Sequence, residues 1–311
     1  MSDNLAFVFP GQGSQKIGML SQLASVDSII EGTFSEASDA LGYDLWHLVQ
    51  NGSQEEINLT ERTQPILLAS SVAIWRLWQD KSGAQPSQLA GHSLGEWTAL
   101  VCAGVLTFTD ALTIVRARGQ YMQDAVPFGV GAMAAIIGLA DEAILQACAD
   151  ARQNDVVDAV NFNAPGQVVI AGSAPAVQRA IECCKAAGAK RALPLPVSAP
   201  FHTSLMAPAA ERLKGLVTDT PFAEPIIPVI HNVHAETETD PEKIKTLMLE
   251  QISQPVKWVD CVLKLKSGGA ERFVECGPGR VLSGLSKRID KELISFATDD
   301  VENFENALLS V

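Results

Sequence analysis

The sequence lacks the long apolar segments that membrane proteins need. Its 311 residues contain no apolar run close to the ~18 residues that span a bilayer. Residues 1–4 (MSDN) offer neither the basic flank nor the long apolar core of a signal peptide. We therefore expect a cytoplasmic protein with no membrane contact.

Basic residues are also scarce. The chain has 23 Lys and Arg against 36 Asp and Glu, a formal net charge of −13. Nucleic-acid phosphates and anionic membranes are bound by clustered basic residues, so we expect neither as a partner. The six cysteines show no C-x-x-C spacing, which favours reduced, mostly buried thiols.

The periodicity of the sequence indicates a mixed α/β protein. Hydrophobic residues make up 47% of the chain and charged residues 19%, which is enough apolar material for a substantial core. A length of 311 residues suggests roughly two domains. Before residue 128, short apolar strands (5–9, 89–90) alternate with helical patterns (65–78, 108–123), which favours a parallel sheet.

The segment 128–197 has a different pattern. Predicted strands (132–137, 156–161, 167–171, 191–197) and helices (141–152, 175–187) follow the order βαββαβ, which is typical of a ferredoxin-like unit. We predict a large domain formed by residues 1–127 and 198–311, with residues 128–197 inserted as a small ferredoxin-like subdomain.

The pentapeptide GHSLG at residues 91–95 matches the G-x-S-x-G pattern of a nucleophile elbow. In such an elbow a strand turns sharply into a helix, and glycines on either side of the serine relieve the crowding. Ser93 is then the nucleophile, although an ordinary Gly-Ser turn has the same pattern. Glu96 would stand in the first turn of the following helix, where the helix dipole favours an acid.

A serine nucleophile needs a base, and the chain has five histidines. His92 adjoins the serine but should point away from it, and His47 falls in a helical pattern. His231 and His234 form H-x-x-H without a further ligand cluster, a weak indication of metal. His202 follows a proline-stiffened segment just after the small subdomain, where it is either the base or a structural loop residue.

Five sequence blocks resemble a known enzyme family. They are LAFVFPGQGSQ at 5–15, GHSLGEW at 91–97, RGQYMQ at 118–123, PFH at 200–202 and GPG at 277–279. In this order and spacing, over nearly the whole chain, they resemble the malonyl-CoA:acyl carrier protein transacylases of fatty acid synthesis. The resemblance implies a large α/β-hydrolase-like domain with the same inserted subdomain.

The resemblance also implies a catalytic dyad of Ser93 and His202. No acid between them, among Asp110, Asp124, Asp141 and Asp158, has a recognisable triad context. In the family a backbone carbonyl orients the imidazole, and the matching position here is Gln254, where the family more often has Asn.

Further site residues follow from the same resemblance. Gln12 stabilises the oxyanion, together with the amide of Leu94, which directly follows the nucleophile. The block around Gln12 lacks the Lys-Ser/Thr ending of a P-loop, so a nucleotide-phosphate role is not expected. Arg118 pairs with the free carboxylate of a malonyl group. Composition alone would instead predict a solvent-exposed arginine on a helix.

Two further positions can line the substrate cleft. Gln64 lies in a TQP block that resembles another family block, although a helix-start residue needs no function. Phe201, in APFH, resembles the HAFH motif of malonyl-selective acyltransferase domains, where many bacterial members have Ser. Its ring would crowd the α-carbon of the acyl group, or simply pack within the loop.

The expected reaction is ping-pong acyl transfer. Malonyl-CoA acylates the serine, and the malonyl ester passes to the phosphopantetheine thiol of acyl carrier protein, with no metal or redox cofactor. A serine hydrolase such as a thioesterase or esterase is the alternative, and a non-catalytic binding protein is a third. We expect a monomer.

Carrier-protein docking is expected at two basic clusters. Acyl carrier proteins are generally acidic, so an enzyme at −13 needs positive charge beside its cleft. The candidates are Lys190, Arg191, Arg280, Lys287 and Arg288. Scattered surface charges that only favour solubility are the alternative.

Overall fold

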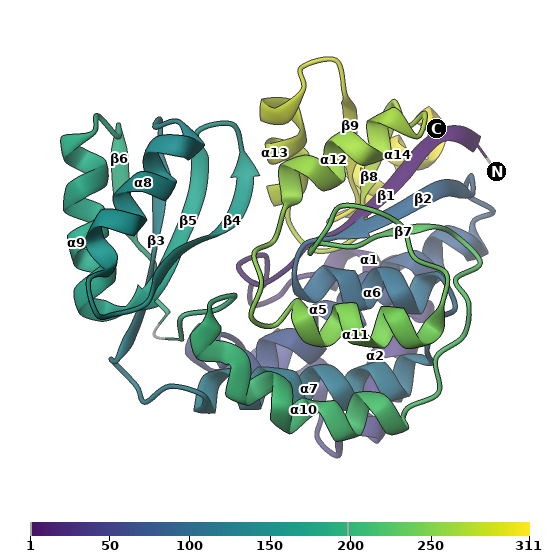
Figure 1. The fold of residues 1–311 in the computed structure, drawn as a ribbon. Coiled ribbons are helices and arrows are strands. Elements are labelled where there is room, and N and C mark those ends of the chain that lie inside the picture. The colour runs from purple at the N-terminus through teal and green to yellow at the C-terminus, as the bar shows by residue number, and fades with distance from the viewer. Residues whose placement is uncertain (1, 198) are drawn as a thin grey trace.

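Two separate sheets organise the computed structural model, which describes residues 2–197 and 199–311 (Figure 1). One sheet is parallel with strand order β7-β2-β1-β8-β9, and the other is antiparallel with order β4-β5-β3-β6. The predicted mixed α/β class with a parallel sheet is confirmed. The predicted return of the chain at Ser198 lies outside the described residues.

The parallel sheet is built around a strand that is apolar on both faces. It contains β1 (Ser2–Phe9), β2 (Pro86–Gly91), β7 (Val229–Ile230), β8 (Arg272–Glu275) and β9 (Ile294–Ala297). Residues 5–9 of the central β1 are all apolar and at most 1% exposed. This is the composition expected of a parallel strand with helices on both faces.

Alternate residues of β1 divide the core of the large sheet in two. Leu5, Phe7 and Phe9 belong to a large cluster with α5, α6 and α7, whereas Ala6 and Val8 pack with α12 and α13 on the other face. This is the period of two that a strand imposes. The helices outside the segment of the antiparallel sheet are α1 (Ser21–Val26), α2 (Ser28–Leu41), α3 (Leu45–Asn51), α4 (Gln54–Ile57), α5 (Thr60–Asp80), α6 (Leu94–Cys102), α7 (Phe108–Asp124), α10 (Ala207–Asp219), α11 (Pro241–Glu250), α12 (Trp258–Ser267), α13 (Val281–Ile289) and α14 (Val301–Ser310), with a 3-10 turn at Ser204–Met206.

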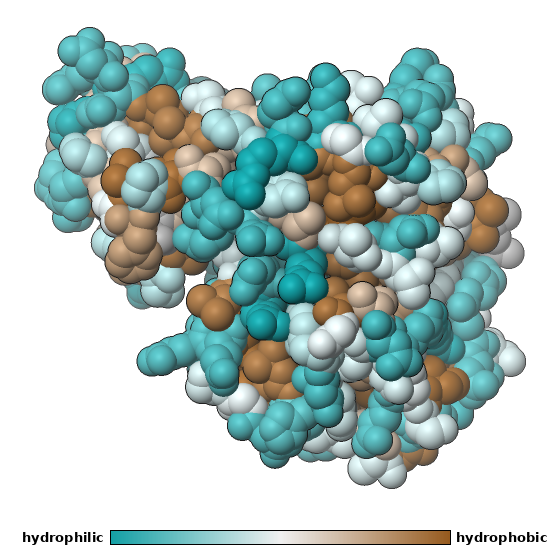
Figure 2. Space-filling view, turned by 90° about the horizontal axis from the view of Figure 1, so that it is seen from below, coloured by the Kyte–Doolittle hydropathy of each residue, from teal (hydrophilic) through white to brown (hydrophobic). Residues whose placement is uncertain are grey.

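The antiparallel sheet forms the lobe at the left of Figure 1. It contains β3 (Gly131–Ile137), β4 (Val157–Ala164), β5 (Gln167–Ser173) and β6 (Arg191–Pro194), with α8 (Asp141–Arg152) and α9 (Ala174–Ala186) between them in the predicted order. Ala134 and Ile136 face the α8–α9 cluster, and their neighbours Met133 and Ala135 line a cleft against the large sheet. Figure 2 shows a notch between this lobe and the main body.

Other sequence expectations concern membranes and thiols. Across the described residues no helix is long and apolar enough to cross a bilayer. The six cysteines are free thiols, five of them buried and Cys183 half-buried, as expected.

Candidate active site

The site lies where three parallel strands end. Gln12 follows β1, Ser93 follows β2, and Asn232 follows β7, so all three occupy the carboxyl edge of the sheet. Crevices outside this edge are the usual ligand sites of open α/β sheets. Chain segments far apart in sequence are brought together here by strand pairing.

Ser93 has the strained backbone of a nucleophile elbow. It has φ +51°, in the left-handed half of conformational space that non-glycine residues rarely adopt, between β2 and α6. The flanking glycines are needed for space. A Cβ on Gly91 would lie 1.9 Å from the carbonyl carbon of Gly95, and one on Gly95 would lie 2.0 Å from the carbonyl oxygen of Phe9.

Ser93 and His202 are hydrogen-bonded. Ser93 Oγ lies 2.8 Å from Nε2 of His202, whose Nδ1 lies 2.8 Å from the carbonyl oxygen of Gln251. A carbonyl only accepts, so Nδ1 carries the proton and Nε2 is free to accept from the serine. Burial, followed by the positive charge of Arg118, lowers the pKa of His202 to about 3. The imidazole is therefore a neutral base at physiological pH.

Two backbone groups of one segment contact the imidazole. The 2.8 Å bond at Nδ1 comes from the carbonyl of Gln251, the first residue after helix α11. The backbone of the predicted Gln254 also hydrogen-bonds His202 and raises its pKa by less than Gln251 does, so the orienting role of Gln254 stays a prediction. Sequence alone gave no indication of where that helix ends relative to the histidine.

Arg118 is buried beside the dyad, at 2% exposure. Its guanidinium donates to Gln64 Oε1 at 2.8 Å, to Gln251 Oε1 at 2.9 Å and to Ser93 Oγ at 3.2 Å, and Nε has no partner. Burial lowers the pKa of Arg118 to about 10. Arg116, two residues earlier, is exposed and faces another side of α7, as the spacing predicts.

The buried guanidinium has no carboxylate partner within salt-bridge distance in the described part of the chain. Its acceptors are neutral amides and a hydroxyl. Buried charges are normally paired, so the arrangement fits an anionic group supplied from outside the protein.

These groups open into a cleft of about 310 Å³ between the two sheets. Gln12 and Leu94 line it beside the nucleophile, and the loop of Gln12 is packed closely on the elbow, since a Cβ on Gly11 would lie 2.4 Å from the His92 carbonyl oxygen. The apolar side of the cleft includes Phe201, which is 9% exposed. The small sheet contributes Met133, Ala135 and Val169, and Leu195 directly follows its strand β6.

The other histidines have structural partners. His92 Nε2 lies 2.8 Å from Asn163 Oδ1 on β4, which ties the elbow to the small sheet. His231 contacts Glu96 at 2.7 Å, and His47 contacts Asn51 one helical turn away. Across residues 2–197 and 199–311, no three His, Cys, Asp or Glu side chains are grouped to hold a metal ion.

The five predicted docking residues differ in their partners. Arg280 pairs with Asp299 at 3.2 Å and Asp300 at 3.1 Å, which neutralises its charge. Arg288 donates to Gln167 at the start of β5. Arg191 on β6 lies in the same row of the small sheet, because Ile137 of β3 pairs with both Gln167 and Arg191. Lys190 and Lys287 are exposed near these two arginines in the chain.

Three site residues were missed by the sequence analysis in these roles. Gln251 contacts Ser93, Arg118 and His202, and Asn232 Oδ1 accepts from the Ser93 amide at 2.8 Å. Glu96 was noted only as a first-turn helix acid, but it is fully buried behind the nucleophile. Loop glutamines and asparagines carry no local pattern that would single them out.

Comparison with known proteins places the chain in a family of acyltransferases. Residues 6–302 match the model of the acyl transferase domain, and the chain belongs to this family. The malonyl CoA-acyl carrier protein transacylase of Escherichia coli (strain K12) is 53% identical over 303 residues, covering 97% of this chain and 98% of that protein.

Solved structures of similar proteins agree closely with this fold. The acyl carrier protein S-malonyltransferase of Vibrio cholerae is 57% identical with a TM-score of 0.96, covering 97% of this chain and 99% of that one. A malonyl-transacylase solved in complex with a holo type II PKS acyl-carrier protein is 52% identical with a TM-score of 0.98, covering 99% and 100%.

Proposed function

We propose that this chain transfers a malonyl group from malonyl-CoA to the phosphopantetheine thiol of an acyl carrier protein. The observation that carries the proposal is the buried Arg118, whose partners are two neutral amides and, at 3.2 Å, Ser93 Oγ. A short acyl group that ends in a carboxylate fits between these two residues. Its carboxylate would pair with the guanidinium while its thioester carbon meets the nucleophile.

The dyad supplies the chemistry of both half-reactions. His202 takes the proton of Ser93 as its oxygen attacks the thioester carbon, and the oxyanion is stabilised by the amide of Leu94 and by Gln12. The C–S bond breaks, and the imidazolium returns the proton to the CoA thiolate. In the second half-reaction His202 takes the proton of the carrier thiol as its sulfur attacks the carbonyl carbon of the malonyl ester. The bond from that carbon to Ser93 Oγ breaks, and the imidazolium returns the proton to the serine oxygen.

Intact-protein mass spectrometry tests this proposal directly. After malonyl-CoA, the parent should carry one malonyl group that discharges onto holo carrier protein, and Ser93→Ala should carry none. His202→Ala should be acylated several orders of magnitude more slowly. A free malonate product with no transfer to carrier protein would identify a serine hydrolase instead.

The finer fold assignment is also a proposal. We interpret residues 1–127 and 198–311 as an α/β-hydrolase-like domain and residues 128–197 as a ferredoxin-like subdomain. The order βαββαβ and the strand order β4-β5-β3-β6 support the second assignment. We further propose a cytoplasmic monomer. We propose no metal or redox cofactor, since each step above needs only side chains and backbone amides of this chain.

For carrier-protein docking we propose the rim formed by Arg191 and Arg288, with Lys190 and Lys287 beside them. Charge reversal of Arg191 and Arg288 to Glu should raise the KM for carrier protein and weaken its salt dependence, because rim charges act mainly on association. Arg280→Glu makes the same change of charge at a predicted docking residue outside this rim, where the arginine pairs with Asp299 and Asp300, and is the control for the location of the effect. Equal effects of the control and the double reversal would argue against this rim.

A further inference from the structure

Glu96 is a fully buried acid directly behind the nucleophile, in the first turn of α6. Three nitrogen donors surround its carboxylate. Gln251 Nε2 lies 2.6 Å and the Asn232 amide 3.2 Å from Oε2, and His231 Nδ1 lies 2.7 Å from Oε1. Oε2 accepts from two N–H groups, so the direction of the remaining bond, at Oε1, depends on which nitrogen of His231 carries a proton.

His231 does not neutralise this charge. Its Nδ1 faces Glu96 Oε1, while its Nε2 is buried without a hydrogen-bond partner. Both an imidazolium and the neutral Nε2–H tautomer would leave an N–H donor unsatisfied at Nε2, which is costly in a buried site. His231 is therefore the neutral Nδ1–H tautomer, and Glu96 keeps its negative charge.

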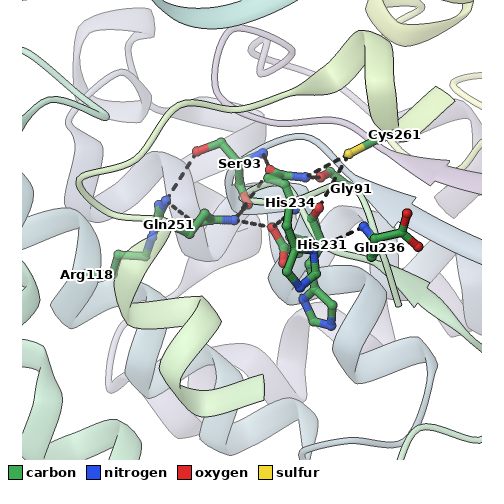
Figure 3. Close-up of polar contacts among 10 residues, drawn as sticks. Gly91, Ser93, Arg118, His231, His234, Glu236, Gln251 and Cys261 are labelled. Carbon is green, nitrogen blue, oxygen red and sulfur yellow. Dashed lines mark hydrogen bonds and ion pairs between the residues drawn. The ribbon is translucent and has the colours of Figure 1, made fainter. Parts of the chain in front are cut away.

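Gln251 connects Glu96 to the catalytic groups through both ends of its side-chain amide. Its Oε1 accepts from Arg118 at 2.9 Å, and its Nε2 donates to Glu96 and to the Ser93 carbonyl at 2.9 Å. Figure 3 shows Gln251 between Arg118 and Ser93 on one side and His231 on the other. The backbone carbonyl of the same residue holds His202 at 2.8 Å.

The two buried charges influence each other across this amide. Glu96 is the charged neighbour that raises the pKa of Arg118 against the larger, lowering effect of burial. Each hydrogen bond of the relay involves an ionised group, and such bonds are shorter and stronger than neutral ones. The chain Arg118–Gln251–Glu96 therefore fixes the guanidinium at its 3.2 Å distance from Ser93 Oγ.

We propose that Glu96 is a positioning residue for acyl selection: it is the buried counter-charge of Arg118, and it fixes that guanidinium through the side-chain amide of Gln251. This inference rests on the proposed malonyl transfer. Glu96 touches no reacting atom. Its effect reaches the substrate carboxylate through Arg118, so it should matter for malonyl groups and little for acetyl groups.

A double-mutant cycle on acyl selectivity tests the proposal. Acylation of Ser93 would be followed with malonyl-CoA and acetyl-CoA in the parent, Glu96→Gln, Arg118→Met and the double variant. Glu96→Gln keeps the side-chain volume and removes the charge. We expect it to lower the malonyl-to-acetyl ratio of kcat/KM about tenfold in the parent, and by less than about twofold in the Arg118→Met background.

A merely structural role gives a different result. If Glu96 only supported the fold, Glu96→Gln would slow acylation by malonyl-CoA and by acetyl-CoA equally, or would change their ratio equally in the parent and in Arg118→Met. Either result would overturn the proposal. Glu142→Gln removes an exposed first-turn acid from α8 and is the control for a helix-dipole effect. It should leave the ratio unchanged, and a change equal to that of Glu96→Gln would also overturn the proposal.

A second variant covers the case in which Glu96→Gln does not fold. Gln251→Leu breaks the relay but keeps the backbone carbonyl that holds His202, so it should reproduce the loss of selectivity. An unchanged ratio in that variant refutes the relay. Absence of any malonyl adduct in the parent would refute the proposed function instead, which separates the two failures.

Discussion

Replacement of Arg118 by Met should separate acyl selectivity from folding. The guanidinium is buried, and its pKa is lowered from 12.5 to about 10. A cation with a depressed pKa destabilises the folded state at every pH below that pKa, here by about 3 kcal/mol at neutral pH. Met removes this penalty, but it leaves the amide oxygens of Gln64 and Gln251 without their donor, at about 1–3 kcal/mol each.

In the free enzyme, removal of the buried cation stabilises Arg118→Met, and the loss of two hydrogen bonds destabilises it. In the malonyl complex, the missing cation is itself a loss. We expect the free energy of unfolding to stay within about 3 kcal/mol of the parent. With malonyl-CoA, the variant must bury an unpaired carboxylate at a cost of about 3–5 kcal/mol, so acylation should fall by about two to three decades. Acetyl-CoA has no carboxylate and should lose much less, or gain.

Single-turnover acylation measured by mass spectrometry with both thioesters checks this prediction, alongside urea unfolding. Arg116→Met is the matched control, because that arginine lies on the same helix but is exposed. It should retain parental acylation with both substrates. Equal losses for malonyl-CoA and acetyl-CoA in the Arg118 variant would refute carboxylate recognition by this residue.

Three further predictions concern packing, pH and acyl size. Gly95→Ala should lower the free energy of unfolding in urea by about 3 kcal/mol or more, because its Cβ would lie 2.0 Å from a β1 carbonyl oxygen. Gly32→Ala in α2, with open space around it, is the control and should be neutral or stabilising. Similar effects of the two substitutions would contradict the crowding argument. Burial raises the pKa of Glu275 to about 6, so its ionisation destabilises the fold as pH rises through about 4.5 to 6. In urea titrations, Glu275→Gln should therefore gain up to about 2 kcal/mol of stability relative to the parent over that pH window. A stability difference that does not change with pH would contradict this assignment. Phe201→Ser should admit methylmalonyl-CoA in the acylation assay, and unchanged rejection would indicate that the ring only packs the loop.

Local sequence was sufficient for the main elements and for the sharp turn at Ser93. The uninterrupted apolar run at residues 5–9 predicts a strand buried on both faces, and the order βαββαβ of 128–197 follows from periods of 2 and 3.6 residues. Ser93 was identified because an elbow needs glycines within two residues of it, a constraint that is local in the chain. Boundaries were predicted less well: the helix predicted at 65–78 is α5, Thr60–Asp80, which already begins five residues before Pro65.

The residues that hold the nucleophile in place were decided by tertiary structure. Gln251 and Asn232 lie 158 and 139 positions from Ser93 in the chain, yet both bond to its backbone. Glu96 has the sequence context of a solvent-exposed first-turn acid, but α6 is packed so that its carboxylate is fully buried. Parallel strand pairing brings the ends of β1, β2 and β7 to one edge, and no periodicity in the sequence encodes which loop side chains meet there.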